Sequence, residues 1–152
     1  MSDRLVLFVC TGNICRSPMA EYLLRSESES IPGWRVESAG VSAGNGMAAS
    51  IEGVKALAEL SIDMRNHRSR GLTTDLVDEA ELIVVMTRAH DQQVRVCFPG
   101  ARKKTCLLKS FDRTAVHDDV ADPIGSPVSV YCETRDEIRR SLPGMVDFLK
   151  AL

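Results

Sequence analysis

The chain has 152 residues, of which 44% are hydrophobic and 26% are charged, and a formal net charge of −2 at pH 7. These values are typical of a soluble globular protein with a sizeable core, so we expect residues 1–152 to form a single domain. A charge this close to zero gives no general reason to expect nucleic acid or an anionic membrane as a partner, so any anion binding must be local.

The apolar runs and the cysteines indicate the cellular setting. The run at 5–10 is too short for the hydrophobic region of a signal peptide, and no later run is long enough to span a membrane. The five cysteines are an odd, scattered set that forms neither a disulfide framework nor a C-x2-C zinc motif. We therefore expect a cytoplasmic protein without a metal ion, in which Cys97, Cys106 and Cys132 are buried thiols.

Taken in chain order, apolar runs alternate with helical patterns. Leu5–Cys10 is a continuous apolar stretch, as expected of a central parallel strand that is covered on both faces. Pro18 begins a helical stretch, for which Ser17 can act as the N-cap. The patterns that follow predict strands at 35–38, 82–86 and 105–108, and helices at 47–60, 73–80 and 88–96.

The last pattern is a long amphipathic stretch that opens at Ser126-Pro127, and we expect Pro143-Gly144 to break or kink it. Four strands separated by helices predict a parallel α/β fold with right-handed crossovers. In such sheets the ligand lies outside the carboxyl ends of the strands. The residues that directly follow the strand at 5–10 are therefore the first place to look for a site.

Those residues read Cys10-Thr11-Gly12-Asn13-Ile14-Cys15-Arg16-Ser17-Pro18. A cysteine and an arginine at a C-x5-R spacing are weak evidence for a site on their own, because five cysteines give such a match by chance in about a quarter of similar chains. Gly12 and Asn13 strengthen the signal, since both tolerate the backbone that turns successive N–H groups inward around an anion. The helix that follows adds its N-terminal dipole.

This setting favours the thiolate of Cys10, which is the nucleophilic form. Arg16 can hold two phosphate oxygens at once and stays charged. Ser17 can donate a hydrogen bond to the sulfur. A plain turn does not need Gly, Asn, Arg and Ser together, so the stretch indicates chemistry on a phosphate through a cysteine nucleophile.

The nine residues resemble the signature of the low-molecular-weight protein tyrosine phosphatase family. That family includes bacterial protein-arginine phosphatases, and the thioredoxin-coupled arsenate reductases are its relatives. Ser38-Ala39-Gly40, the apolar run into Met86-Thr87, and Asp122-Pro123 also occur in the order expected of it. The resemblance implies a three-layer α/β/α sandwich with a central four-stranded parallel sheet, and a phosphocysteine intermediate formed without a cofactor.

The resemblance also implies roles for residues outside the loop. A phosphatase needs an acid for the leaving group and then a base for water, and Asp122 matches the family's acid. Asp118 and Asp119 are alternatives that the sequence alone leaves open. The implied site consists of catalytic residues Cys10, Arg16 and Asp122, the phosphate-binding loop of Thr11, Gly12, Asn13, Ile14, Cys15, Arg16 and Ser17, and supporting residues Asn13, Ser17, Ser38 and His67.

Cysteine and histidine residues give two further expectations. Cys15 matches the family's second loop cysteine and is close enough in sequence to form a reversible disulfide with Cys10. His90 and His117 are interpreted as structural or surface residues.

The substrate cues conflict. Family members that act on phosphotyrosine usually carry aromatic residues after the Asp-Pro pair, whereas Asp122-Pro123 is followed here by Ile124-Gly125-Ser126 and no aromatic occurs in 41–47. That resembles the bacterial branch with the arginine phosphatases. These typically have Thr where this chain has Ile14, and Ile14 matches the tyrosine type. We give Ile14 more weight because it lies beside the phosphate, and so predict phosphotyrosine, with phosphoarginine as the alternative.

Two other functions fit the loop less well. An arsenate reductase needs two more cysteines to relay a disulfide outward, but the position after the third strand reads Val85-Met86-Thr87, and Pro18 replaces the usual glutamine. A silent phosphate-binding module does not need a nucleophile, an arginine and an acid together. The expected partner is therefore a phosphorylated protein rather than nucleic acid or membrane, and the enzyme is expected to be a monomer or a weak homodimer.

Overall fold

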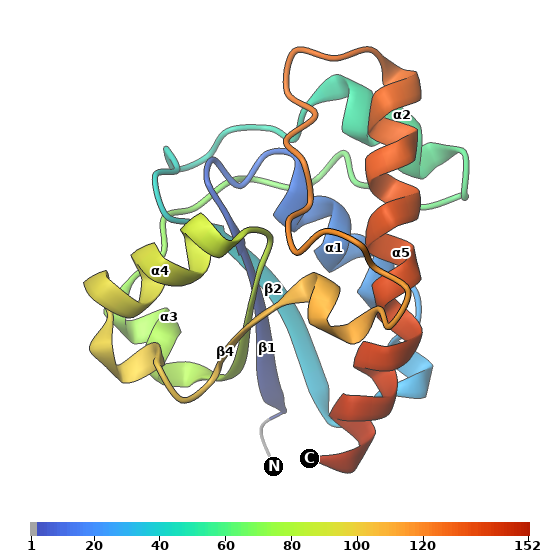
Figure 1. Cartoon of the computed structure of the whole chain (residues 1–152). Helices are drawn as coiled ribbons and strands as arrows, with labels where there is room; N and C mark the ends of the chain where they lie inside the picture. The colour runs from blue at the N-terminus through green and yellow to red at the C-terminus, as the bar shows by residue number, and fades with distance from the viewer. Residues whose placement is uncertain (1–2) are drawn as a thin grey trace.

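The computed structural model describes residues 3–152 (Figure 1). Its four strands are β1 (Arg4–Cys10), β2 (Trp34–Gly40), β3 (Ala80–Val85) and β4 (Thr105–Leu107). They form one parallel sheet in the order β2-β1-β3-β4. The expected α/β fold with a four-stranded parallel sheet is confirmed. The helices are α1 (Arg16–Arg25), α2 (Ile51–Ala58), α3 (Thr74–Glu79), α4 (Arg88–Cys97) and α5 (Val128–Ala151), with short 3-10 helices η1 (Ser28–Ser30), η2 (Pro99–Ala101) and η3 (Leu108–Phe111).

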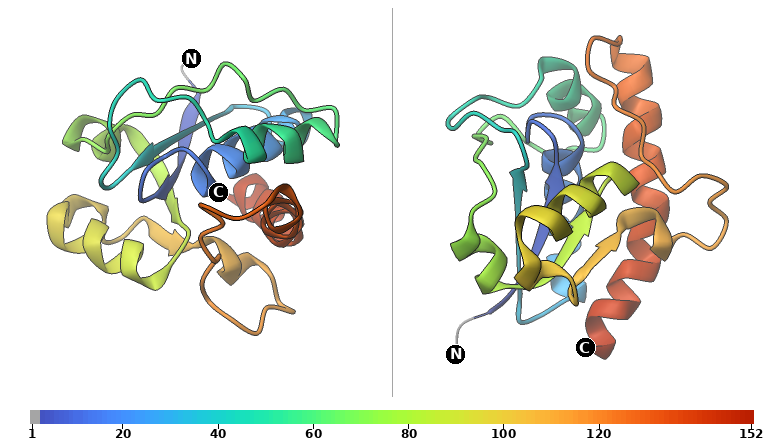
Figure 2. Two further views of the ribbon diagram at one scale, coloured as in Figure 1. Left: turned by 90° about the horizontal axis from the view of Figure 1, so that it is seen from above. Right: turned by 60° about the vertical axis from the view of Figure 1, so that its left-hand side comes forward.

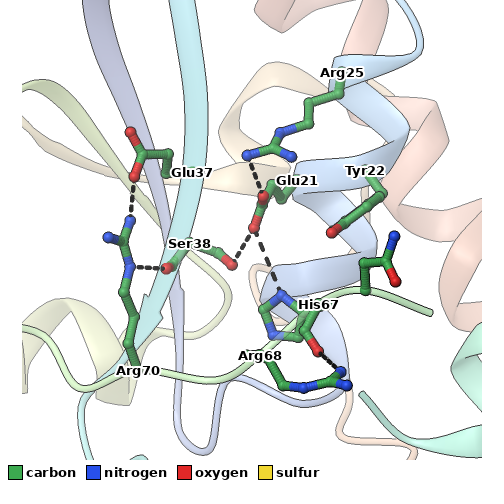
Figure 3. Close-up of a pocket in the computed structure, with 9 residues that line it drawn as sticks. Glu21, Tyr22, Arg25, Glu37, Ser38, His67, Arg68 and Arg70 are labelled. Atoms are coloured by element: carbon green, nitrogen blue, oxygen red, sulfur yellow. Dashed lines mark hydrogen bonds and ion pairs between the residues drawn. The ribbon is translucent and has the colours of Figure 1, made fainter. Parts of the chain in front are cut away.

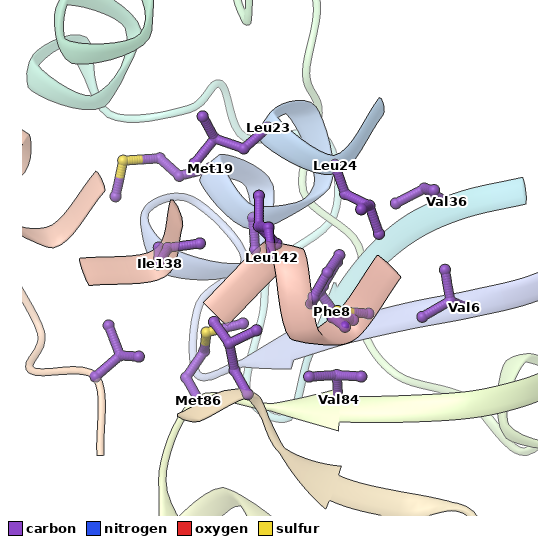
Figure 4. Packing of buried hydrophobic residues seen from close by; sticks show 14 of the residues in the cluster. Val6, Phe8, Met19, Leu23, Leu24, Val36, Val84, Met86, Ile138 and Leu142 are labelled. Carbon is purple, nitrogen blue, oxygen red and sulfur yellow. The ribbon is translucent and has the colours of Figure 1, made fainter. Parts of the chain in front are cut away.

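Helices cover both faces of the sheet, as the views from above and from the side show (Figure 2). On β1, Val6 and Phe8 face the core shared with α1 and α5, whereas Leu7 and Val9 face the core shared with α3 and α4. Because successive strand side chains point to opposite faces, a strand buried on both sides must be apolar throughout. Figure 4 shows Phe8 and Val84 packed beneath Leu142 of α5.

Three local expectations are wrong. The first helix begins at Arg16 with Cys15 as its N-cap, so Ser17 lies inside the helix and does not cap it. The last helix runs unbroken from Val128 to Ala151 with Pro143 inside it. Its buried face, which includes Leu142 and Met145, packs along its length, and this packing outweighs the backbone hydrogen bond that a proline removes.

The third wrong expectation concerns the cysteines. Cys97, at the end of α4, is exposed, and Cys106 and Cys132 are partly buried. Cys97 lies three residues after the buried Val94 and thus on the same face of α4, but it is the last residue of the helix, so its position at the helix end rather than its residue type decides its exposure.

The carboxyl ends of the strands meet at one edge of the sheet. Cys10, the last residue of β1, is in register with Gly40, the last residue of β2. A Cβ on Gly40 would lie 2.5 Å from the carbonyl oxygen of Thr11 and 3.1 Å from the nitrogen of Asn13. Glycine at this position therefore lets the loop after β1 fold back against β2.

Two further features of residues 3–152 concern membranes and metal ions. No helix in this range has both the length and the apolar character that crossing a membrane requires. The same range contains no group of three or more His, Cys, Asp or Glu side chains placed to hold a metal ion.

Candidate active site

The loop between β1 and α1 is curled into a ring of backbone donors. Asn13 has a left-handed backbone with φ of 57°. The backbone N–H groups of residues 11–15 donate to no described backbone or side-chain group. Buried backbone donors are nearly always paired, so a run of free N–H groups beside a cysteine is the arrangement expected of an anion site.

Asn13 holds the loop in this shape. Its Nδ2 donates to Ser17 Oγ at 2.8 Å and to Ser38 Oγ at 2.9 Å, and its Oδ1 accepts from the backbone nitrogen of Arg70 at 3.0 Å. Its backbone oxygen accepts from His67 Nε2 at 2.7 Å. The supporting residues predicted from the sequence are thus in contact, and each bond fixes the orientation of the buried Asn13 side chain or peptide.

These bonds set the direction of the hydrogen bond between Ser17 and Cys10 Sγ. Ser17 Oγ lies 2.9 Å from Cys10 Sγ and already accepts a hydrogen bond from Asn13. The hydroxyl proton of Ser17 is therefore free for the sulfur. A donor aimed at the sulfur stabilises the negative thiolate and not the neutral thiol.

The same chain of bonds continues to a buried carboxylate on α1. Ser38 donates to Glu21, which also pairs with Arg25 at 2.7 Å and lies 4.0 Å from His67 Nδ1 (Figure 3). Burial raises the pKa of Glu21, whereas the bond from Ser38 and the charges of Arg25 and His67 lower it. Because Ser38 gives its hydroxyl proton to Glu21, its Oγ can accept a hydrogen bond from Asn13 Nδ2. The network therefore reaches from Cys10 to the outer side of α1.

Arg16 closes the other side of the loop. Its guanidinium is buried, with Nη1 donating to the carbonyl oxygen of Val120 at 3.0 Å and Nη2 lying 3.5 Å from Asp122 Oδ2. Its Nε is buried and has no partner among the described residues. A buried guanidinium donor left unpaired is costly. This N–H is therefore available to donate to an oxyanion bound in the loop.

The candidate acids are separated by the geometry. Asp122 lines a pocket of about 140 Å³ together with Cys10, Ile14 and Arg16, and its side chain is 45% exposed at the rim. Asp119 instead accepts from the backbone nitrogen of Arg88 at 2.8 Å, and Asp118 lies 3.7 Å from the Arg88 guanidinium. Both line a different hollow, so of the three only Asp122 faces the cysteine loop.

A family model described as low molecular weight phosphotyrosine protein phosphatase matches residues 5–152. The chain belongs to this family. The matched range contains the cysteine loop after β1, the arginine at its far end and the aspartate at the rim of the pocket.

Relatives within this phosphatase family differ in their named substrate. A protein-arginine-phosphatase of Geobacillus stearothermophilus is 41% identical over 145 residues, which is 95% of each chain. A probable low molecular weight protein-tyrosine-phosphatase, EpsP of Ralstonia nicotianae, is 36% identical over 149 residues, which is 98% of each chain. A solved structure described as YwlE arginine phosphatase, a cysteine-to-serine mutant with a phosphorylated active site serine, is 39% identical with a TM-score of 0.89, and covers 96% of this chain and 95% of its own.

The second loop cysteine of this phosphatase is also held in place. Cys15 is buried, and its Sγ lies 3.3 Å from the hydroxyl oxygen of Tyr131 on α5. Burial raises the pKa of the Cys15 thiol, and the bond to Tyr131 opposes that effect. All five cysteines are free thiols in the described part of the chain.

Two residues of the site were not found from the sequence. Glu21 is one, although it lies four residues after Ser17 and therefore on the same face of α1 as the loop. His90 is the other. It is buried, and its Nε2 lies 2.8 Å from Thr11 Oγ1, so its interpretation as a mere structural or surface residue overlooked a contact with the loop. The available signal was its position just after β3, at the edge where ligands bind.

Proposed function

We propose that the protein hydrolyses phosphotyrosine in proteins, with Cys10, Arg16 and Asp122 as the catalytic residues. The Cys10 thiolate attacks phosphorus and the bond from phosphorus to the leaving oxygen breaks, while Asp122 gives that oxygen a proton. Water then attacks the phosphocysteine, the phosphorus–sulfur bond breaks, and the Asp122 carboxylate takes a proton from the water. Arg16 and the free N–H groups of the loop hold the other phosphoryl oxygens.

The single observation that carries this mechanism is that Cys10, Arg16 and Asp122 line one pocket at the carboxyl edge of the sheet. The bond from Ser17 to Cys10 supports it further, because it serves the sulfur both as nucleophile and as the later leaving group. The related YwlE structure is described as a cysteine-to-serine mutant with a phosphorylated active site serine, which supports a phosphorylated nucleophile in this enzyme as well.

Phosphotyrosine is favoured by the walls of the pocket. Ile14 and Ile124 line it with aliphatic side chains. A phenyl ring can bury its faces against two aliphatic side chains without loss of hydrogen bonds. A phosphorylated guanidinium brings N–H groups, and burying these against isoleucine without acceptors costs free energy.

Phosphoarginine is the second candidate, and a specific observation favours it. The relatives at 41% and 42% identity are both named protein-arginine-phosphatase, whereas EpsP of Ralstonia nicotianae, named a probable tyrosine phosphatase, is 36% identical. Asp122 can accept from a guanidinium N–H, and one partly exposed carboxylate offers that substrate a single anchor.

The test is a comparison of kcat/KM on matched phosphotyrosine and phosphoarginine peptides. We expect phosphotyrosine to be preferred at least tenfold by the native enzyme, and Ile14→Thr to shift the ratio toward phosphoarginine. Cys10→Ser is the blank and should show no turnover of either peptide while keeping its fold by circular dichroism. Equal or better turnover of phosphoarginine by the native enzyme overturns the substrate, and turnover by Cys10→Ser overturns the mechanism.

The setting of the reaction follows from the same features. We place the protein in the cytoplasm, a reducing compartment, because a chain with five free thiols suits such a compartment. Its partners are phosphorylated proteins, and we expect it to act as a monomer or a weak homodimer. Sedimentation at micromolar concentration checks the oligomeric state, and a stable larger assembly would contradict it.

A further inference from the structure

His90 lies outside the pocket but contacts a residue that lines it. The imidazole is in the first turn of α4 and only 4% exposed. Its Nε2 is 2.8 Å from Thr11 Oγ1, and its Nδ1 is buried without a partner among residues 3–152. Thr11 follows the nucleophile Cys10 and forms part of the pocket wall. One imidazole nitrogen thus has a hydrogen-bond partner in the loop, and the other has no partner among the described residues.

The ring is neutral at physiological pH. Burial lowers the pKa of His90 to about 4, and the positive charge of Arg16 adds to this effect. The carboxylates of Asp119 and Asp122 oppose it. A neutral imidazole carries one N–H, so the contact with Thr11 has two possible directions.

The unpaired Nδ1 distinguishes the two directions. If the proton were on Nδ1, a buried N–H would have no acceptor, and such orphaned donors are rare and costly. If the proton is on Nε2, it is donated to Thr11 Oγ1, and only a lone pair on Nδ1 is left without a partner. The Nε2–H tautomer is therefore the one that the burial favours. In that tautomer Thr11 Oγ1 is an acceptor, and its own hydroxyl proton is free.

We propose that His90 is a positioning residue that turns the hydroxyl proton of Thr11 toward the substrate in the pocket. The hydroxyl then acts beside Arg16 and the loop N–H groups as one more donor to a phosphoryl oxygen. This inference rests on the proposed phosphatase function and deepens it. It assigns recognition of the phosphoryl group to a pair of residues contributed by the loop after β1 and by α4.

The first experiment reads the tautomer without using activity. The chain has three histidines, so two-bond nitrogen–proton correlation spectra of 15N-labelled protein resolve each ring, and His90→Gln assigns the signals. We expect His90 to be the neutral Nε2–H form throughout pH 6 to 8. An Nδ1–H tautomer, or an imidazolium at pH 7, overturns the proposal.

The second experiment measures coupling between the two residues with an aryl phosphate as substrate and vanadate as the bound probe. Thr11→Val keeps the shape of the side chain and removes the hydroxyl, and we expect kcat/KM to fall about tenfold and vanadate to bind more weakly. His90→Leu should give a similar loss, and the double variant should be no worse than Thr11→Val alone, because both remove one interaction.

Two further variants separate orientation from packing. In His90→Gln the side-chain amide can still donate to Thr11, so we expect most of the activity to return, mainly in kcat. Thr11→Ser should likewise retain activity. His117→Asn, at an exposed position, is the matched histidine control and should leave kcat/KM unchanged.

The outcomes distinguish this inference from the proposed function. Additive losses in the double variant, or a Thr11→Val enzyme with native kcat/KM and native vanadate affinity, overturn the role of His90 while the native enzyme still turns over. An absence of turnover in the native enzyme overturns the proposed function itself. If His90→Leu fails to fold, the Thr11→Val kinetics and the tautomer still decide the question.

Discussion

Asp122 and Arg16 face each other across the pocket, with Asp122 Oδ2 3.5 Å from Arg16 Nη2. The arginine is buried, and the aspartate is held at the rim, where its Oδ1 accepts from the backbone nitrogen of Ile124 at 3.1 Å. The guanidinium that we propose binds the phosphoryl group thus also contacts the carboxyl group that we propose as the acid.

Replacement of Asp122, the proposed acid, tests this arrangement. Asp122→Asn should lower kcat on phosphotyrosine about 10²- to 10³-fold, the range expected for loss of a general acid, while vanadate binding changes little. Steady-state kinetics and vanadate inhibition measure both quantities. Asp118→Asn, whose carboxylate faces Arg88, should remain near native. If Asp119→Asn instead shows the loss expected for Asp122→Asn, then Asp119 and not Asp122 is the acid.

Asn13 offers a test that separates backbone conformation from side-chain bonding. Asn13→Gly keeps a residue that tolerates the positive φ, and Asn13→Ala does not, but both lose the donors to Ser17 and Ser38. We expect both to lower kcat at least tenfold, and Ala to be less stable than Gly by about 1 kcal/mol. Urea unfolding measures the difference, and native activity in Asn13→Gly would show that the bonds are dispensable.

The close approach of β2 to the loop predicts a steric effect. Gly40→Ala places a Cβ against two backbone atoms of the loop, so we expect a loss of about 1–3 kcal/mol in the free energy of unfolding and a lower kcat. Gly44→Ala is the control, because its Cβ meets only the flexible side chain of Met47 at 3.8 Å, and its effect should stay within about 0.5 kcal/mol. Equal effects at the two positions would contradict the role of Gly40.

The pH dependence of stability follows from His90. Its pKa is about 4 in the folded protein against an ordinary 6.5, so between these values the unfolded chain binds more protons. The free energy of unfolding therefore falls as the pH drops from 6.5 to 4, by about 3 kcal/mol from this group. His90→Gln lacks this titrating group. As the pH drops from 6.5 to 4, its free energy of unfolding should therefore rise relative to that of the native protein. A constant difference between pH 7 and pH 4 would contradict the buried neutral imidazole.

Cys15 gives an expectation for oxidation. Peroxide should inactivate the native enzyme, and dithiothreitol should restore it, because a Cys10–Cys15 disulfide protects the nucleophile from further oxidation. In Cys15→Ser the inactivation should become permanent, whereas Cys132→Ser should recover like the native enzyme. Mass spectrometry of the oxidised protein identifies the product. Failure of the thiol to restore the native enzyme would show that no protective disulfide forms.

Some of this site could be predicted from the sequence, because its signals are local. The apolar run before Cys10, the glycine and asparagine after it and the arginine at the end of the loop occur within one short segment. Local patterns decide strands and helix faces well, and the carboxyl edge of a parallel sheet is where they place a ligand.

The parts that were missed depend on distant pairings. The contact between His90 and Thr11 joins residues 79 positions apart, and no local pattern marks it. The helix start was misplaced because Ser17 uses its hydroxyl on Cys10 and Asn13 instead of on the helix end. A proline predicts a break only where packing does not oppose it, and α5 packs along the core on both sides of Pro143.

The bonds to Asn13 have a consequence for moving this chemistry to another protein. The nine-residue motif carries Cys10 and Arg16, but three of the four groups that hold Asn13 come from Ser38, His67 and Arg70, far along the chain. A graft of the motif alone onto a different strand–loop–helix would keep its reactive groups and lose their arrangement. A portable version must bring the end of β2 and the segment around residues 67–70 with it.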